Sequence, residues 1–124
     1  MRIVKLCAGL AAGLILVGAA AAANNYGSIA YSQETGAVGY SFDHPDKQSA
    51  INAALNGCYE NANDCVTATS FWNGACGAVA VGENGGWSSG TGSDQYVAQD
   101  NAIYSCEERD TNCTVRRFQC TRKR

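Results

Sequence analysis

The side chains best suited to chemistry gather around the only histidine of the sequence, His44. Asp43 and Asp46 flank this histidine, and Ser41 and Ser49 lie nearby. A serine nucleophile, a histidine base and a carboxylate that orients the base together perform acyl transfer in many enzymes. The same stretch, "DHPD", is also an ordinary helix start, because acids favour the N-terminal end of the helix dipole and proline favours the turn. We therefore predict no catalytic residue here.

Carboxylates are the second candidate for chemistry. Two acidic loops, "YENAND" and "EERDTN", lack the alternating oxygen ligands and the fixed glycine of a calcium-binding loop. Glycoside cleavage needs a pair of carboxylates at a defined separation, and the sequence selects no such pair. We predict no metal site and no cofactor, and a small hydrolase that uses carboxylates stays open as an alternative.

The N-terminus, residues 1–23, has the three parts of a secretory signal peptide. A basic start precedes an apolar run from Leu6 to Val17, and small residues extend to Ala23. We therefore expect cleavage near Ala23 and a single secreted or periplasmic domain over residues 24–124. The apolar run is short for a bilayer, so stable membrane insertion after cleavage is not expected.

Charge is unevenly distributed along the chain. Nine basic and eleven acidic residues give a formal net charge of −2, and two of the basic residues belong to the predicted signal peptide. Five of the seven remaining basic residues lie between Arg116 and Arg124. A protein dedicated to nucleic-acid binding usually carries a basic face overall, so nucleic acid is not an expected partner.

Seven cysteines are present, and six of them remain once Cys7 leaves with the signal peptide. An even number of cysteines in a short exported chain is typical of a disulfide framework. Zinc ligands usually come in pairs about two to four residues apart, whereas the closest cysteines here have six residues between them. The spacing therefore favours disulfides over a zinc site.

An internal repeat organises the mature chain. Cys58 and Cys65 have six residues between them, as do Cys106 and Cys113, and a shift of 48 superimposes the two pairs. Upstream, "YGSIAY" matches "CGAVAV" at a shift of 50. Cysteines, acids and apolar positions agree together, which indicates a tandem duplication.

Each copy has the pattern of a hairpin, a helix and a third strand. The first unit covers about residues 26–72 and the second unit about residues 76–120. Asp46 and Asp94 are predicted N-caps of the two helices, and "CVTATSFW" and "CTVRRFQC" predict the third strands. We predict an α+β fold in which two tandem hairpin-helix-strand repeats form one disulfide-stabilised domain with antiparallel sheet. The two units are expected to be related by an approximate two-fold, with the helices on one face of the sheet.

The repeat also predicts how the cysteines pair. Each unit has one cysteine at its helix end and one at the start of the next strand, and the two cysteines left over must join each other. The predicted bonds are Cys58–Cys65, Cys106–Cys113 and Cys76–Cys120. The counterparts of Cys76 and Cys120 in the first unit are Tyr26 and Trp72. We therefore predict an aromatic contact in the first unit at the place of the bond in the second.

Three residues are candidates for binding. Trp87 follows the tip of the second hairpin, where a tryptophan is either an exposed anchor or a cap on the core. Arg116 and Arg117 belong to the basic end, which either faces an acidic or anionic partner or forms a solvated strand edge. We take Trp87, Arg116 and Arg117 as the candidate binding residues.

The repeated stretches "YGSIAYSQETGAVGYS" and "CGAVAVGENGG", each followed by two cysteines with six residues between them, resemble the bacterial family called domain of unknown function 4189. The stretch "NGACGAVAVG" is the most specific part, and the resemblance covers about Tyr26 to Cys120. Members are small exported proteins, so the resemblance implies an envelope or extracellular location. It implies no established activity and no catalytic residue.

These features together favour a secreted, disulfide-stabilised binding module over an enzyme. The expected partner is a protein or another envelope component, which includes the case of an inhibitor that acts on a toxin or a hydrolase. A carboxylate hydrolase and a structural envelope protein are the alternatives.

Overall fold

The structure is a computed structural model that describes residues 24–123. The predicted signal peptide with Cys7, and the terminal Arg124, lie outside the described residues. No helix between residues 24 and 123 is long and apolar enough to cross a membrane.

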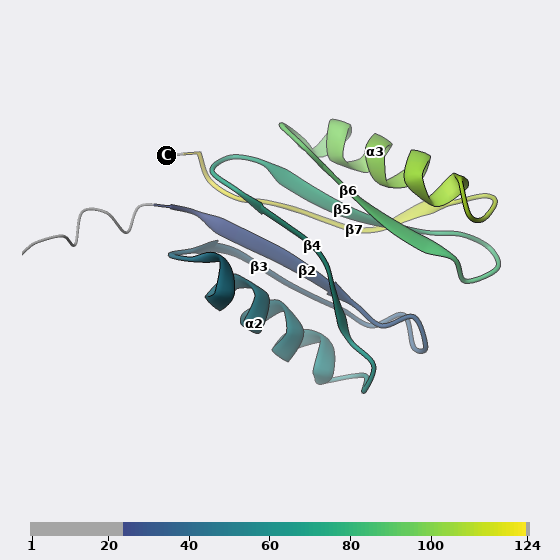
Figure 1. The fold of residues 1–124 in the computed structure, drawn as a ribbon, viewed down its shortest axis with the longest axis horizontal. Helices are drawn as coiled ribbons and strands as arrows, with labels where there is room; N and C mark the ends of the chain where they lie inside the picture. The colour runs from purple at the N-terminus through teal and green to yellow at the C-terminus, as the bar shows by residue number, and fades with distance from the viewer. Residues whose placement is uncertain (1–23, 124) are drawn as a thin grey trace, which may run out of the picture.

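The two units contain the same elements in the same order, as predicted (Figure 1). The elements of the first unit are β2 (Tyr26–Tyr31), β3 (Val38–His44), α2 (Lys47–Tyr59) and β4 (Val66–Trp72). Those of the second unit are β5 (Cys76–Val81), β6 (Trp87–Gly92), α3 (Gln95–Glu107) and β7 (Thr114–Cys120). Asp46 and Asp94 are the N-caps of α2 and α3, and their carboxylates accept hydrogen bonds from backbone amides of the first turn.

Each unit forms its own three-stranded antiparallel sheet. The strand orders are β3-β2-β4 and β6-β5-β7, so the first strand of each unit is the central one. The sheets share an irregularity: the register shifts between Ile29 and Ala30 where β2 meets β4, and between Val79 and Ala80 where β5 meets β7. Ile29 is the repeat equivalent of Val79, and Ala30 that of Ala80, so the duplication extends to the details of strand pairing.

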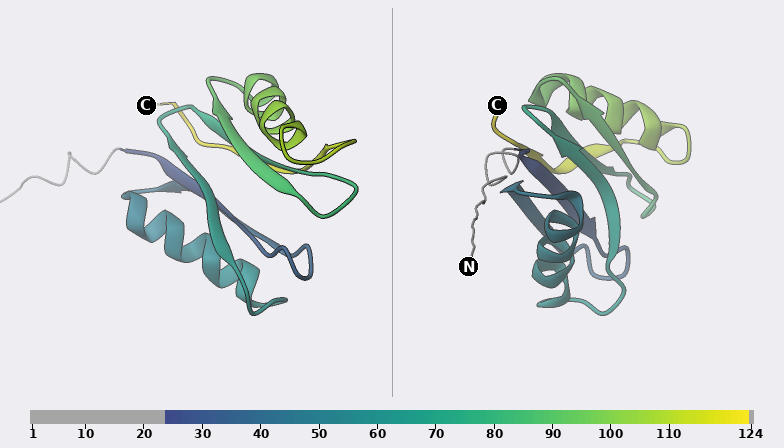
Figure 2. Two further views of the ribbon diagram at one scale, coloured as in Figure 1. Left: turned by 45° about the vertical axis from the view of Figure 1, so that its right-hand side comes forward. Right: turned by 60° about the vertical axis from the view of Figure 1, so that its left-hand side comes forward.

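The layers differ from the expectation that both helices share one face of a sheet. The two sheets stack against each other, and α2 and α3 cover opposite outer faces of the stack (Figures 1 and 2). The central strands explain this arrangement, because they are apolar on both faces. Ala30 packs toward α2, whereas Ile29 and Tyr31 pack between the sheets. Each sheet therefore needs a helix on one side and the other sheet on its second side.

Residue size sets the thickness of each layer. Small residues separate each sheet from its helix, mainly alanines and cysteines. Larger residues fill the space between the sheets, including Ile29, Phe71 and Val79. At Gly39 in β3, an added Cβ would overlap the backbone carbonyl of Ala54, so only glycine allows α2 to lie this close to the sheet.

All three predicted disulfides are present. Two of them tie a helix end to the following strand, and the third joins the central strand of the second sheet to its edge strand. They are Cys58–Cys65, Cys106–Cys113 and Cys76–Cys120.

Candidate functional site

The residues around His44 hold the local structure together rather than forming a catalytic arrangement. The Ser41 hydroxyl donates to the carbonyl of Ala50 at 2.7 Å, and the Ser49 hydroxyl donates to the carbonyl of Asp46 at 3.1 Å. Both hydroxyls are thus directed at the backbone of α2 and its cap. The prediction that this stretch is a helix start agrees with these contacts.

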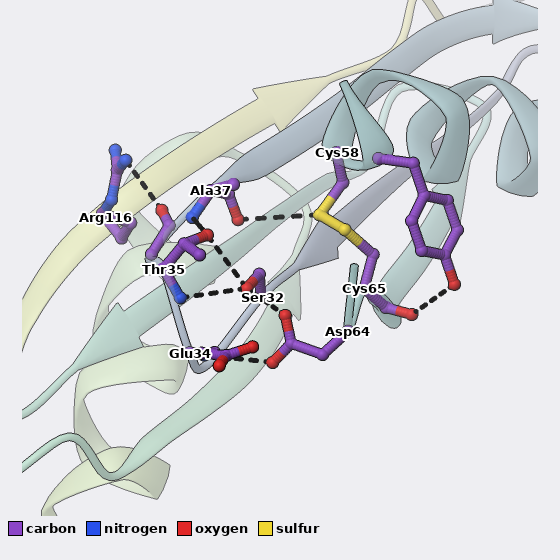
Figure 3. Close-up of a disulfide and its surroundings, with 10 residues drawn as sticks. Ser32, Glu34, Thr35, Ala37, Cys58, Asp64, Cys65 and Arg116 are labelled. Atoms are coloured by element: carbon purple, nitrogen blue, oxygen red, sulfur yellow. Dashed lines mark hydrogen bonds between the residues drawn. A yellow bond between two sulfur atoms is a disulfide. The ribbon is translucent and has the colours of Figure 1, made fainter. Parts of the chain in front are cut away.

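The two acidic loops anchor the hairpin turns. In the first unit, Asp64 accepts hydrogen bonds from the Ser32 hydroxyl and the Glu34 amide (Figure 3). In the second unit, Asp110 accepts from the amides of Asn84 and Gly86, at 3.1 and 2.7 Å. The turn and the loop after the helix are therefore locked together in both units.

The anchoring carboxylates come from positions that the repeat does not superimpose. A shift of 48 places Asp64 on Asn112 and Ala62 on Asp110. Gly82 leaves room for Asp110, because an added Cβ at this glycine would overlap that carboxylate. The two units thus reach the same anchoring of a turn through different residues.

Hydrogen bonding lowers the pKa of these carboxylates. The Ser32 hydroxyl is the main cause for Asp64, and the amide of Thr111 is the main cause for Asp110. The pKa of Glu83 is lowered in the same way, chiefly by the hydroxyl of Thr111. Among residues 24–123, no group of three or more histidine, cysteine or acidic side chains is placed to hold a metal ion.

Trp87 is half-buried at the margin of the core between the sheets. Its ring lies 5.2 Å from the ring of Tyr31, centroid to centroid, with the planes tilted by 57°. Val38 and Val81 pack against the same cluster. Trp87 therefore takes the place of a cap on the core, and its role in binding stays a prediction.

Arg116 and Arg117 lie where the second sheet meets the first. The Arg116 guanidinium donates to the carbonyl of Gly36, in the turn between β2 and β3, at 2.8 Å (Figure 3). The guanidinium carbon of Arg117 lies 3.6 Å from the centre of the Tyr40 ring in β3. Both arginines of β7 thus reach across to the first unit, and Arg117 makes a cation–π contact there.

The Arg117 guanidinium is only partly satisfied. One Nη atom donates to the side-chain oxygen of Gln119 at 2.9 Å. Its Nε atom is buried and has no hydrogen-bond partner among the described residues. A buried donor without an acceptor costs about 1–3 kcal/mol, so this side chain is not placed to maximise the stability of the fold.

These side chains border a groove, which we call the arginine groove. It has a volume of about 460 Å³. Its lining residues are Thr35, Gly36, Ala37, Val38, Tyr40, Asn61, Arg116 and Arg117. None of these described residues is acidic, although acids outnumber basic residues in the chain as a whole. The groove is therefore a local basic site on an acidic protein.

Comparison with known proteins places the chain in a family. Residues 26–120 match the family model described as a domain of unknown function, DUF4189. The chain belongs to the DUF4189 family. No curated protein and no solved structure matches it. Membership confirms the resemblance seen in the sequence and brings no activity with it.

The repeat of this DUF4189 protein offers an internal comparison for the groove. Tyr40 and Ser89 pair with the equivalent residues Ile29 and Val79, so they occupy equivalent places in β3 and β6. Arg117 corresponds in the same way to Thr69 of β4.

The edge formed by β6 and β4 is equivalent to the edge formed by β3 and β7, and small residues there bring the two sheets into contact. The Ser89 hydroxyl donates to the carbonyl of Ala68 at 2.8 Å, which links β6 directly to β4. The fold therefore closes one edge with a serine and a threonine. Tyrosine and arginine at the other edge of the DUF4189 protein are not required by the architecture.

The sequence pointed to Arg116 and Arg117 but missed Tyr40. The alternation in "VGYSF" places Tyr40 and Phe42 on one face of β3 and Gly39 and Ser41 on the other. Tyr40 and Phe42 are 45% and 48% exposed, which is unusual for aromatic residues on an inward face. This alternation was the available signal, but it did not show that β7 lies opposite.

Proposed function

We propose that this protein is a non-catalytic binding module that recognises an anionic group of a protein or envelope partner in the arginine groove. The observation that carries this proposal is the guanidinium of Arg117, which lines the groove over Tyr40 and forms an ion pair with no acidic side chain among the described residues. A carboxylate or another oxyanion in the groove supplies the missing counter-charge and accepts a hydrogen bond from this guanidinium. The resulting hydrogen bond is charge-assisted and about twice as strong as a neutral one.

The composition of the groove supports recognition. Tyrosine and arginine are enriched at the centres of protein interfaces, and Arg117 over Tyr40 combines both. The Arg116 guanidinium is already held by the Gly36 carbonyl, so one of the two charges is fixed before a ligand arrives. Less conformational freedom is then lost on binding.

The wall of the groove is also rigid. Gly36 and Ala37 belong to a turn that Asp64 anchors through Ser32 and Glu34. The Cys58–Cys65 bond lies beside this turn, and the carbonyl of Ala37 points at the Cys58 sulfur at 3.7 Å (Figure 3). A preformed groove of this kind favours affinity because little ordering remains to be done.

The acidic side chains favour binding over hydrolysis. A carboxylate that acts as a general acid needs a raised pKa. Hydrogen bonds lower the pKa of Asp64, Glu83 and Asp110 instead, and these carboxylates hold turns and loops.

Export to an oxidising compartment is part of the same proposal. Three disulfides in a small chain are typical of secreted or periplasmic proteins, where such bonds persist.

Calorimetric titration of the mature protein with a short glutamate-rich peptide tests the proposal. Arg117→Gln should weaken binding by about 10-fold or more, because a hydrogen bond to a charged group contributes about 1.5–3 kcal/mol. Arg122→Gln is the matched control. Arg122 also carries one positive charge near the end of β7, but it pairs with Asp43 at 3.2 Å and does not line the groove.

The control separates a defined site from general attraction between charges. If Arg117→Gln and Arg122→Gln weaken binding equally, or if neither does, the arginine groove is not the binding site and the proposal is wrong.

A further inference from the structure

β7 is an edge strand, and its pairing with β5 shows which of its backbone groups point away from the sheet. Within the described residues it pairs with β5 alone, at the margin of the β6-β5-β7 sheet. The Thr121 amide donates to the carbonyl of Ala75 at 3.1 Å, one position beyond the paired residues Cys76 and Cys120. Bonding alternates along an antiparallel pair. Cys120 and Phe118 therefore direct their backbone groups away from β5, toward the open edge.

Two grooves flank this open edge, one on each face of the sheet. The arginine groove lies on the inner side, where Arg117 meets Tyr40. A second groove of about 630 Å³ lies on the outer side, toward α3. Its lining residues are Gln99, Val115, Arg116, Arg117, Phe118, Gln119 and Cys120. We call it the α3–β7 groove.

Val115 and Phe118 give the α3–β7 groove an apolar part. Val115 and Phe118 are paired with Ala80 and Ala78, which face α3, so their side chains lie on that same face. Phe118 is 40% exposed. A strand placed alongside β7 would direct successive side chains to opposite faces, and so into the two grooves in turn.

We infer that an extended acidic peptide adds to the open edge of β7 as a further strand. Its acidic side chains enter the arginine groove, and the apolar side chains between them enter the α3–β7 groove. This is strand addition, in which main-chain hydrogen bonds give affinity and pockets for alternate side chains give specificity. The inference rests on the proposed function, because it names the ligand that fills the arginine groove.

Charge complementarity identifies the occupant as acidic. None of the described residues that line either groove is acidic, and Arg116 and Arg117 border both. Charged residues and bulges on an edge strand discourage pairing with other strands, so a strand that adds to β7 must supply the opposite charge. Arg117 turns inward over Tyr40 and leaves the backbone of Phe118 open to pairing, whereas the Cys120 carbonyl already accepts a hydrogen bond from the Gln119 side chain at 3.2 Å.

The irregularity in β7 limits the length of the pairing. The register with β5 shifts between Val79 and Ala80, which leaves Arg116 as the extra residue of the edge strand. A bulge interrupts a ladder. The added strand therefore pairs with the part of β7 that follows Arg116, and its acidic residue lies opposite Arg117 or Gln119.

Hydrogen exchange of single backbone amides tests this inference. The ligand is a capped peptide of about six residues in which glutamate alternates with valine. On binding, exchange of the Phe118 amide should slow by about 10-fold or more, because it gains a partner. The Gln119 amide is the internal control, since it already faces β5 and should change little.

A second peptide separates the backbone from the side chains. It has the same sequence with alternate amides N-methylated, so it keeps its charges and cannot form the ladder. It should bind about 10-fold or more weakly. Phe118→Pro, which removes an outward amide and also the apolar side chain in the α3–β7 groove, should weaken the unmodified peptide at least to the same level.

The outcomes also distinguish the two proposals. Equal binding of both peptides, no protection at Phe118 and a loss of affinity in Arg117→Gln would overturn strand addition and leave the proposed function standing. Binding of neither peptide, or binding that Arg117→Gln does not weaken, would overturn both.

Discussion

The rings of Tyr26 and Trp72 stack with their centroids 5.8 Å apart and their planes 17° from parallel. The two residues are direct partners across β2 and β4, as Cys76 and Cys120 are across β5 and β7. One unit thus closes its sheet with a stacked aromatic pair where the other uses a covalent bond. This confirms the contact predicted from the repeat and shows that the duplicated sheets diverged at equivalent positions.

The equivalence predicts that a disulfide can be installed in the first unit. In the double variant Tyr26→Cys/Trp72→Cys, the two cysteines should bond, because they occupy the places of Cys76 and Cys120. The oxidised protein should exceed the matched Tyr26→Ser/Trp72→Ser variant in unfolding free energy by about 2–4 kcal/mol, measured by urea denaturation. Peptide mapping that finds the two new thiols free would contradict the equivalence.

Close packing of α2 on β3 predicts opposite effects for two neighbouring glycines. Gly39→Ala should lower the unfolding free energy by about 1–3 kcal/mol, because its Cβ would overlap the Ala54 carbonyl. Gly57→Ala, inside α2, meets only the Cα of Gly39 at 3.5 Å and should raise it by about 0.5–1 kcal/mol. Thermal denaturation of both variants checks the pair, and effects of the same sign would contradict the described packing.

The anchored turns predict a loss of stability in acid. The pKa of Asp64 is lower in the folded protein than its ordinary value. Its contribution is therefore complete above about pH 4 and disappears as the pH falls through the lower folded value. The unfolding free energy of Asp64→Asn should accordingly fall less steeply below pH 4 than that of the unchanged protein. Parallel curves in urea denaturation at several pH values would show that this carboxylate does not stabilise the turn.

Arg117 should be dispensable for stability. Arg117→Leu removes a buried donor that has no acceptor, and it also loses the cation–π contact with Tyr40. We expect the unfolding free energy to stay within about 1 kcal/mol of the original value, because these two effects oppose each other. Binding of an acidic peptide should be lost. A large loss of stability would mean that Arg117 holds the sheets together.

Local spacing explains why so much of the fold could be predicted from sequence. The cysteine pairs, the caps at Asp46 and Asp94 and the matched strands all depend on residues close in sequence or on the repeat itself. The layers could not be predicted so easily. They depend on which face of β2 carries Ile29 and which carries Ala30, and on the need to cover both.

The arginine groove depends on a contact that neither local spacing nor the repeat predicts. Tyr40 and Arg117 belong to different units, and they meet only because β3 and β7 lie at the same edge of the two stacked sheets. A duplication predicts equal units, whereas this groove exists because the two edges are unequal.

The most direct test of the central claim follows the Nε–Hε signals of the arginines by NMR while a glutamate-rich peptide is titrated into the mature protein. The account predicts that the Arg117 signal shifts strongly and saturates, because the peptide carboxylate binds its guanidinium, while the Arg122 signal changes little. An unmoved Arg117 signal at saturating peptide, or equal shifts of all arginine signals, would contradict it.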